Sequence, residues 1–181
     1  MKFLLIIVIV IAMIIAILLI IALILKKEYT VVRETAIYRS KMDVFEYIKL
    51  LKNQNHYSKW ATMDPNMKQE FIGTDGTVGF VSAWDSNEKN VGKGEQKIVS
   101  ISEGEKVEYD LHFIKPFDGR AMAYMSVNAL SQNQSKVTWG FRGKMKYPMN
   151  LMLLFMNMED MIGRDLSIGL SNLKRILEDK K

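Results

Sequence analysis

The sequence predicts an α+β domain, in which one antiparallel sheet is covered by a long C-terminal helix, behind a single membrane-spanning helix. Three observations predict this. An uninterrupted apolar run extends from Phe3 to Leu25. Short β-branched and aromatic segments, separated by turn signals, fill the middle of the chain. Near the C-terminus, leucines recur with helical spacing. These observations divide the chain into an anchor, residues 1–27, and one domain, residues 28–181.

The N-terminal run is predicted to cross a membrane. No charged or polar side chain lies between Phe3 and Leu25. As a helix rising ~1.5 Å per residue, this segment is about 34 Å long, enough for a hydrocarbon core of about 30 Å. A cleaved signal peptide is the weaker alternative. The run is longer than a signal sequence needs, and Leu25-Lys26-Lys27 offers no small-residue cleavage site.

Charge on either side of the run predicts the orientation of the anchor. Lys2 precedes it, whereas Lys26, Lys27 and Arg33 follow closely. This bias favours a domain on the cytoplasmic side of the cell membrane. The net charge of +5 owes much to the three lysines that flank the run, and no basic stripe indicates nucleic-acid binding. The chain has no cysteine, which excludes thiol nucleophiles and thiolate metal sites.

After the anchor, the pattern becomes that of strands. Tyr29–Tyr38 is β-branched and aromatic, and Ser40 is the expected N-cap of a helix over residues 41–51. Six further strands are predicted at residues 67–74, 77–84, 91–102, 107–113, 121–130 and 137–142. Asp75-Gly76 predicts a two-residue hairpin turn between the first two of them. Because the connections are of hairpin length, the sheet is expected to be antiparallel.

Beyond Pro148 the apolar period becomes helical. A continuous apolar stripe consists of Met158, Ile162, Leu166, Leu170, Leu173 and Leu177. It predicts one long helix over residues 150–178, locally weakened by Gly163 and Gly169. A single antiparallel sheet must cover its apolar face, and this helix is the large element available to do so.

Short motifs recur along the whole chain in a characteristic order. They are Val32-Arg33, Val44-Phe45, Trp60, Met63-Asp64-Pro65-Asn66-Met67, Gly79, Trp84, Val91-Gly92-Lys93-Gly94, alternating Val107, Tyr109, Leu111 and Phe113, Val137-Thr138-Trp139, and Met161-Ile162-Gly163-Arg164-Asp165 with Gly169-Leu170, Leu173-Lys174 and Glu178. With the order strand, helix, six strands, long helix, the chain resembles the helix-grip fold of the START-like, or SRPBCC, superfamily. Within it, the motifs resemble those of bacterial polyketide cyclase/dehydrase-like proteins with an N-terminal membrane anchor.

This resemblance implies a cavity between the sheet and the long helix. Relatives hold lipids, sterols, polyketides or other apolar molecules there, and some catalyse cyclisation. Together with strand parity, the resemblance predicts a ligand cavity lined by Trp60, Trp84, Tyr109, Phe113, Trp139, Phe141, Met152, Phe155 and Met156. The alternative is that these side chains simply fill the core.

No catalytic residue, metal site or cofactor is predicted. His112 shares strand parity with Glu108 and Asp110, so it is expected to face solvent. Gly92-Lys93-Gly94 precedes a strand rather than a helix, which predicts a bend and not a phosphate loop. The apolar segment 147–155 is either the buried start of the long helix or an exposed patch that dips into the membrane.

The expected function is therefore binding of a small apolar or amphipathic ligand by a membrane-tethered domain. The expected partners are the membrane and that ligand, with no nucleic acid and no metal; the sequence names no protein partner. Two alternatives stay open. Polar side chains converging inside the cavity would favour a cyclase/dehydrase-like or hydrolase enzyme. A filled core would favour a protein-interaction module without a ligand.

Overall fold

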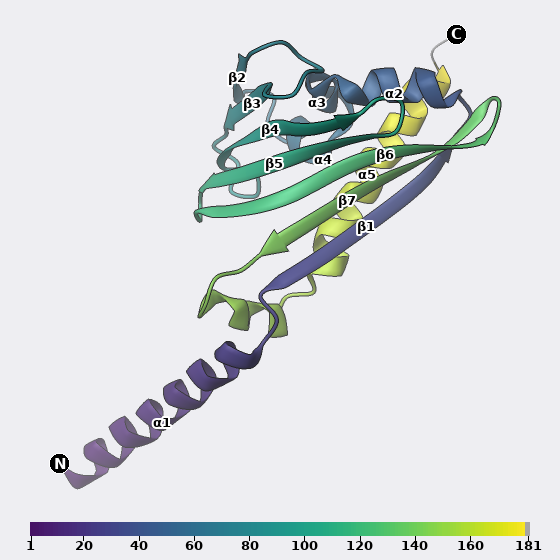
Figure 1. The fold of residues 1–181 in the computed structure, drawn as a ribbon. Helices are drawn as coiled ribbons and strands as arrows, with labels where there is room; N and C mark the ends of the chain where they lie inside the picture. The colour runs from purple at the N-terminus through teal and green to yellow at the C-terminus, as the bar shows by residue number, and fades with distance from the viewer. Residues whose placement is uncertain (180–181) are drawn as a thin grey trace.

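The computed structural model describes residues 1–179, and Figure 1 shows α1 projecting away from a single domain. In this domain a sheet curves around α5. The elements are α1 (Lys2–Ile24), β1 (Glu28–Ile37), α2 (Lys41–Lys49), η1 (Leu51–Asn53), α3 (Gln54–Tyr57), α4 (Lys59–Thr62), β2 (Lys68–Ile72), β3 (Val81–Asp85), β4 (Lys93–Ser102), β5 (Lys106–Lys115), β6 (Gly119–Ser131), β7 (Gln134–Lys144), η2 (Met149–Leu154) and α5 (Met158–Asp179).

The seven strands form one antiparallel sheet in the order β1-β7-β6-β5-β4-β3-β2. All pairings except that of β1 with β7 join strands that follow each other in the chain, as hairpin-length connections predict. The return of β7 to β1 places the strand that follows the anchor beside the strand that precedes η2. The predicted α+β helix-grip architecture, with an apolar helix before it, is confirmed.

The core lies between α5 and the face of the sheet turned toward it, here called the inner face. The predicted leucine stripe of α5 is buried there, namely Leu166, Leu170, Leu173 and Leu177. Each such side chain contributes about 1.5–3 kcal/mol when it leaves water. On the inner face of the sheet, alternate residues such as Val107, Tyr109 and Val137 are equally buried, and the Tyr109 hydroxyl reaches the carbonyl of Ile48 in α2 (3.5 Å).

The predicted two-residue hairpin at Asp75-Gly76 is wrong. β2 and β3 end their pairing at Ile72 and Val81, so residues 73–80 form a longer loop. The Asp75 carboxylate accepts hydrogen bonds from the backbone N–H groups of Leu51 (2.7 Å) and Lys52 (3.1 Å). These contacts hold the loop against η1, so a tertiary interaction overrides the local turn preference.

The long helix predicted over residues 150–178 is in fact two elements. α5 begins at Met158, and the preceding residues form the 3-10 helix η2. The side chain of Asn157 accepts a hydrogen bond from the backbone N–H of Asp160 (3.2 Å), which is the geometry of an N-cap. The Ser40 cap of α2 is confirmed, since its hydroxyl accepts from the backbone N–H of Asp43 (3.2 Å).

Candidate ligand-binding site

The end of α1 is bound to the domain through one buried amide. Nδ2 of Asn150, in η2, donates to the carbonyl oxygens of Ala22 (2.7 Å) and Leu25 (3.4 Å). The last carbonyls of a helix have no partner within the helix, so this side chain caps the C-terminus of α1. The backbone N–H of Met145 also donates to the carbonyl of Lys27 (2.8 Å). As a result, η2 and the start of β1 are held beside the end of α1.

Two hollows lie at this junction. The first is an open groove of about 600 Å³ lined by Leu25, Lys26, Glu28, Tyr29, Leu153, Leu154, Phe155, Met156, Asn157 and Met158. We call it the juxtamembrane groove because it lies at the end of α1, which is long and apolar enough to cross a membrane. Most of its wall is apolar. The second hollow, of about 450 Å³, is lined by Leu25, Lys26, Lys27, Glu28 and Lys144 and is mainly charged. An apolar surface therefore lies next to a cluster of lysines.

Tyr29 belongs both to the groove and to the inner face of the sheet. Its ring stacks on Phe141 with centroids 6.2 Å apart, and Phe141 contacts Phe113 at 6.5 Å. Phe113 in turn meets Trp84 edge-on at 6.2 Å. The strand register places these four rings on one face, and we call them the aromatic row. The row leads from the groove across the inner face.

Small residues accommodate the rings of the aromatic row. A side chain at Gly143 would overlap the ring of Tyr29, and a side chain at Gly94 would overlap that of Trp84. Ala121 and Ala123 lie between the strands that carry the rings. Phe141 is buried, whereas Tyr29, Phe113 and Trp84 are half-buried. These three rings therefore keep surface that a ligand can contact.

The other end of the inner face is filled. Tyr57, Tyr109 and Met125 are fully buried there, and the Tyr57 hydroxyl donates to the sulfur of Met125 (3.2 Å). Burial raises the pKa of both tyrosines well above the usual range, so the phenols are neutral at physiological pH. Trp139 lies at the boundary, with its ring edge-on to Tyr57 (5.7 Å) and to Trp60 (6.4 Å).

The predicted cavity residues consequently fall into separate groups. Trp84, Phe113 and Phe141 lie in the aromatic row, Trp60 and Trp139 border it, and Tyr109 is in the filled core. Phe155 and Met156 line the juxtamembrane groove, and Met152 is exposed on η2. Met152 and Phe155 are not on the inner face, because they precede α5 and lie near the end of α1.

Sequence reasoning missed Tyr29. Its parity with Val31, which is buried on the inner face, and its position directly after the anchor were visible in the sequence. The register that sets it opposite Gly143 was not visible. Burial raises the pKa of Tyr29, so its hydroxyl is a neutral hydrogen-bond donor at the edge of the groove.

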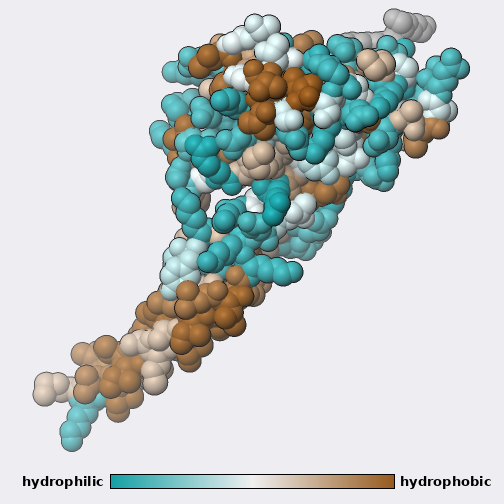
Figure 2. Space-filling view, in the orientation of Figure 1, coloured by the Kyte–Doolittle hydropathy of each residue, from teal (hydrophilic) through white to brown (hydrophobic). Residues whose placement is uncertain are grey.

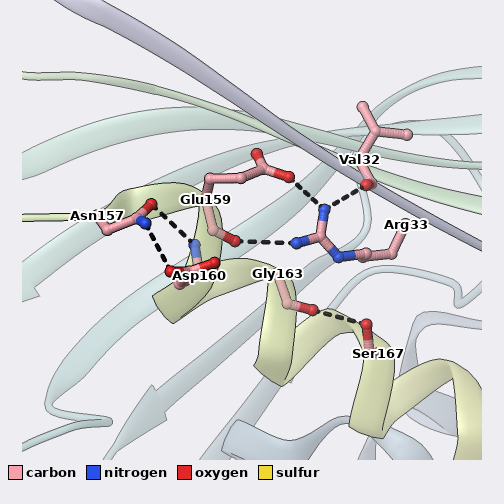
Figure 3. A network of polar contacts seen from close by, with 7 residues as sticks. All are labelled: Val32, Arg33, Asn157, Glu159, Asp160, Gly163 and Ser167. Carbon is pink, nitrogen blue, oxygen red and sulfur yellow. Dashed lines mark hydrogen bonds and ion pairs between the residues drawn. The ribbon is translucent and has the colours of Figure 1, made fainter.

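Charged groups near the inner face are engaged with one another. Figure 3 shows Arg33, from β1, donating to Oε1 of Glu159 (2.5 Å) and to its carbonyl oxygen (3.0 Å). The guanidinium lies over Gly163, where a side chain would displace it. Lys59 of α4 pairs with Asp165 of α5 at 2.6 Å. These pairs fix α5 against β1 and α4.

The histidine of β5 lies outside the site. His112 contacts Asp118 (2.9 Å) and Glu95 (3.5 Å) on the solvent side of the sheet, as its parity predicts. The hydrogen bond from His112 lowers the pKa of Asp118. Within residues 1–179, no three histidine or carboxylate side chains converge as metal ligands would.

Comparison with known proteins supports the fold. No protein-family model matches the chain, and no curated protein matches it either. Among solved structures it is similar to norcoclaurine synthase from Thalictrum flavum in complex with dopamine and hydroxybenzaldehyde, with 14% identity over 85% of this chain and 88% of that one and a TM-score of 0.64. A Thermobifida fusca protein solved by NMR has 17% identity over 82% and 92%, with a TM-score of 0.56.

The protein Ara h 8.0201 is also similar, with 15% identity over 83% of this chain and 95% of that one and a TM-score of 0.55. At these identities the likeness concerns the fold. The chain therefore has the helix-grip fold of Bet v 1-like and START-like proteins, preceded by an apolar helix.

Proposed function

We propose that this protein is a membrane-tethered domain that binds a small apolar or amphipathic ligand along the aromatic row. The observation that carries the proposal is the position of Tyr29. This residue lines the juxtamembrane groove and also stacks on Phe141, the next ring of the row. An apolar surface thus continues from the end of the anchor onto the inner face of the sheet, so the adjacent bilayer is the natural source of the ligand.

The chemistry of the row suits an apolar molecule with one polar end. Aromatic rings offer large apolar area and specific edge and face contacts. Lys26 lines the groove, and Lys27 and Lys144 line the hollow beside it, where an anionic headgroup would find cations. A lipid-like molecule with its tail along the rings and its head at these lysines satisfies both features.

The helix α1 supports the membrane-tethering part of the proposal. α1 is a single helix of 23 residues, long and apolar enough to cross a membrane. A tether raises the local concentration of a binding domain at the surface to which it is attached. The lysines that follow α1 favour a cytoplasmic location for the domain.

Binding is favoured over acid–base catalysis because Arg33 and Lys59 are held in ion pairs that support α5. Aromatic compounds are also candidate ligands. The sequence motifs resemble those of polyketide cyclase/dehydrase-like proteins, and the norcoclaurine synthase complex holds small aromatic molecules. Fatty acids, isoprenoids and polyketide-like aromatics therefore form the panel to be tested.

Native mass spectrometry of the full chain, released from detergent micelles after exposure to that panel, tests the proposal. We expect a stoichiometric adduct in the wild-type protein. Ala121→Phe places a bulky ring between Leu111 and Gly143 on the inner face, where it would compete with a ligand, and should reduce adduct occupancy several-fold. Met122→Phe, at the neighbouring outward position that is 45% exposed, is the matched control and should leave occupancy unchanged.

Thermal unfolding checks that both variants fold. Should Ala121→Phe fail to fold, Leu111→Trp provides a second way to fill the space, since Leu111 is half-buried next to Ala121 in the sheet. Equal occupancy in the wild type and the filled variants would contradict binding along the row.

A further inference from the structure

We propose that η2 is a second membrane-contacting element, lying in the boundary between headgroups and acyl chains beside α1. The proposal rests on the membrane tether proposed above and concerns a different surface from the ligand site. It assigns the exposed apolar side chains of residues 149–155 to contact with lipid rather than with a protein.

Apart from the buried Asn150, the side chains of this segment are apolar, and four of them are exposed. The exposed fractions are 47% for Met149, 38% for Met152, 53% for Leu154 and 82% for Phe155. Folded proteins seldom expose contiguous apolar patches without a use for them. The position of the segment and its charged surroundings indicate that lipid rather than protein covers this patch.

The position of the patch is set by the anchor. Asn150 lies between the exposed side chains in the sequence, and its amide is bonded to the carbonyls of Ala22, in the last turn of α1, and of Leu25, the residue after the helix. Leu25 is also the last residue of the apolar run. Figure 1 shows η2 beside this end of the helix. If α1 spans the bilayer, η2 is therefore held at the depth where the anchor leaves the hydrocarbon.

The surface around the patch has the character of a membrane interface. Figure 2 shows the hydrophobic surface of α1 giving way to hydrophilic side chains at the start of the domain. Lys26, Lys27 and Lys144 lie there. Glu28, the acidic residue among them, is paired with Arg142 (2.6 Å) and Lys144 (3.7 Å). Apolar side chains flanked by lysines are the pattern of segments that lie in an anionic lipid interface.

The bilayer is favoured over a protein partner because the patch is continuous with the anchor. Leu25 of the anchor and Leu153–Met156 line the same groove. A lipid that fills this groove would touch α1 and η2 at once. The contact would also keep the mouth of the groove at the level of the acyl chains.

Depth measurements on the full chain in bilayer nanodiscs test the proposal. Because the chain has no cysteine, single-cysteine variants can be labelled uniquely with a nitroxide. Leu154→Cys and Phe155→Cys report on η2. Leu19→Cys reports on α1, and Val78→Cys, in the exposed β2–β3 loop, is the aqueous control. Nanodiscs contain phosphatidylcholine with phosphatidylglycerol, and paramagnetic relaxation is measured with oxygen and with a water-soluble nickel chelate.

We expect the ratio of oxygen to nickel accessibility at positions 154 and 155 to exceed that at Val78→Cys several-fold, and to lie below that at Leu19→Cys. Ratios at 154 and 155 equal to that of the loop, with Leu19→Cys reading as membrane-embedded, would overturn the proposal and leave the tether intact. An aqueous reading at Leu19→Cys would overturn both. The ligand adduct is measured separately, so its loss or retention does not affect this test.

Discussion

At the scale of single residues, Asn150 couples α1 to the domain. Its amide nitrogen donates to the carbonyls of Ala22 in α1 and of Leu25 directly after it, while its oxygen is buried without a hydrogen-bond partner in the described part of the chain. The side chain therefore gains two hydrogen bonds and carries the desolvation cost of one acceptor. The two hydrogen bonds fix the position of α1 relative to the domain.

Replacement of Asn150 should weaken this junction in a graded way. Asn150→Ala is expected to lower the free energy of unfolding by about 1 kcal/mol through the lost hydrogen bonds. Asn150→Asp should cost more, because a buried carboxylate would face carbonyl oxygens at the negative end of the helix dipole. Urea unfolding of the full chain in micelles, followed by tryptophan fluorescence, measures both.

The Asn150→Asp variant has a second signature. Its folded-state pKa would be raised above the unfolded value, so its deficit should shrink as the pH falls and the carboxyl takes up a proton. Asn128→Ala, at an exposed position on β6, is the control. An Asn150→Asp variant as stable as the wild type at pH 7 would be inconsistent with the amide cap.

Gly163 and Arg33 form a second pair whose effects are coupled. An alanine at position 163 would displace the guanidinium of Arg33 from Glu159. In the Arg33→Ala background this conflict is absent, and Gly163→Ala should stabilise the protein by about 1 kcal/mol through helix propensity. In the wild-type background the gain should be cancelled or reversed. A double-mutant cycle from urea unfolding measures the difference, and additive effects would show that the pair is not coupled.

At the scale of elements, the loop between β2 and β3 depends on Asp75. Its carboxylate accepts from three backbone N–H groups, those of Leu51, Lys52 and Gly76. Asp75→Ala leaves them without this acceptor and should cost about 1–3 kcal/mol. Asp75→Asn keeps one acceptor oxygen and should cost less.

Thermal unfolding compares the two Asp75 variants with Glu70→Ala, an exposed change on β2 that should be neutral. If Asp75→Ala were as stable as Glu70→Ala, the loop would not depend on this carboxylate. A smaller loss for Asp75→Ala than for Asp75→Asn would also contradict the capping role.

Elements with a strong internal period were predictable from the sequence. The leucine stripe of α5, the Ser40 cap and the side-chain parity of the strands depend on local spacing, and all appear in the structure. The start of α5 was not predictable, because Asn150 is engaged by α1, which is distant in the sequence. For the same reason Met152 and Phe155 lie beside the anchor rather than on the inner face. The hairpin predicted at Asp75-Gly76 was wrong for a similar reason, because Asp75 contacts η1.

At the scale of the whole molecule, three exposed carboxylates and the half-buried Asp64 make stability sensitive to acid. Hydrogen bonds from Arg142, Ser86, Lys93 and His112 lower the pKa values of Glu28, Asp64, Asp85 and Asp118 respectively. A group whose pKa is lower in the folded state stabilises the fold above its unfolded pKa, about 4, and loses this contribution as the pH falls through the folded value.

The urea midpoint of the full chain should therefore fall as the pH is lowered from 6 to about 3, the region of these carboxylate pKa values. Added salt should reduce the pH dependence, because exposed pairs are screened. A midpoint that is unchanged or rises on acidification would contradict the role of these pairs.

The anchor, the juxtamembrane groove and the aromatic row form one continuous apolar path. α1 is the helix that we propose crosses the bilayer, η2 borders the groove, and Tyr29 connects the groove to the row. The fold class and much of the row were predictable, because they depend on alternation along strands. The continuity with the anchor was not, because it depends on the pairing of β1 with β7.

The most direct test of this account is where a bound lipid lies. A fatty acid with a diazirine near its terminal methyl, irradiated with the full chain in nanodiscs, should cross-link to peptides that contain Trp84, Leu111 or Phe113. Excess unlabelled ligand and Ala121→Phe should suppress these cross-links, and Met122→Phe should not. Cross-links confined to α1 and η2, and insensitive to Ala121→Phe, would mean that lipid contacts the anchor alone, in contradiction to binding along the aromatic row.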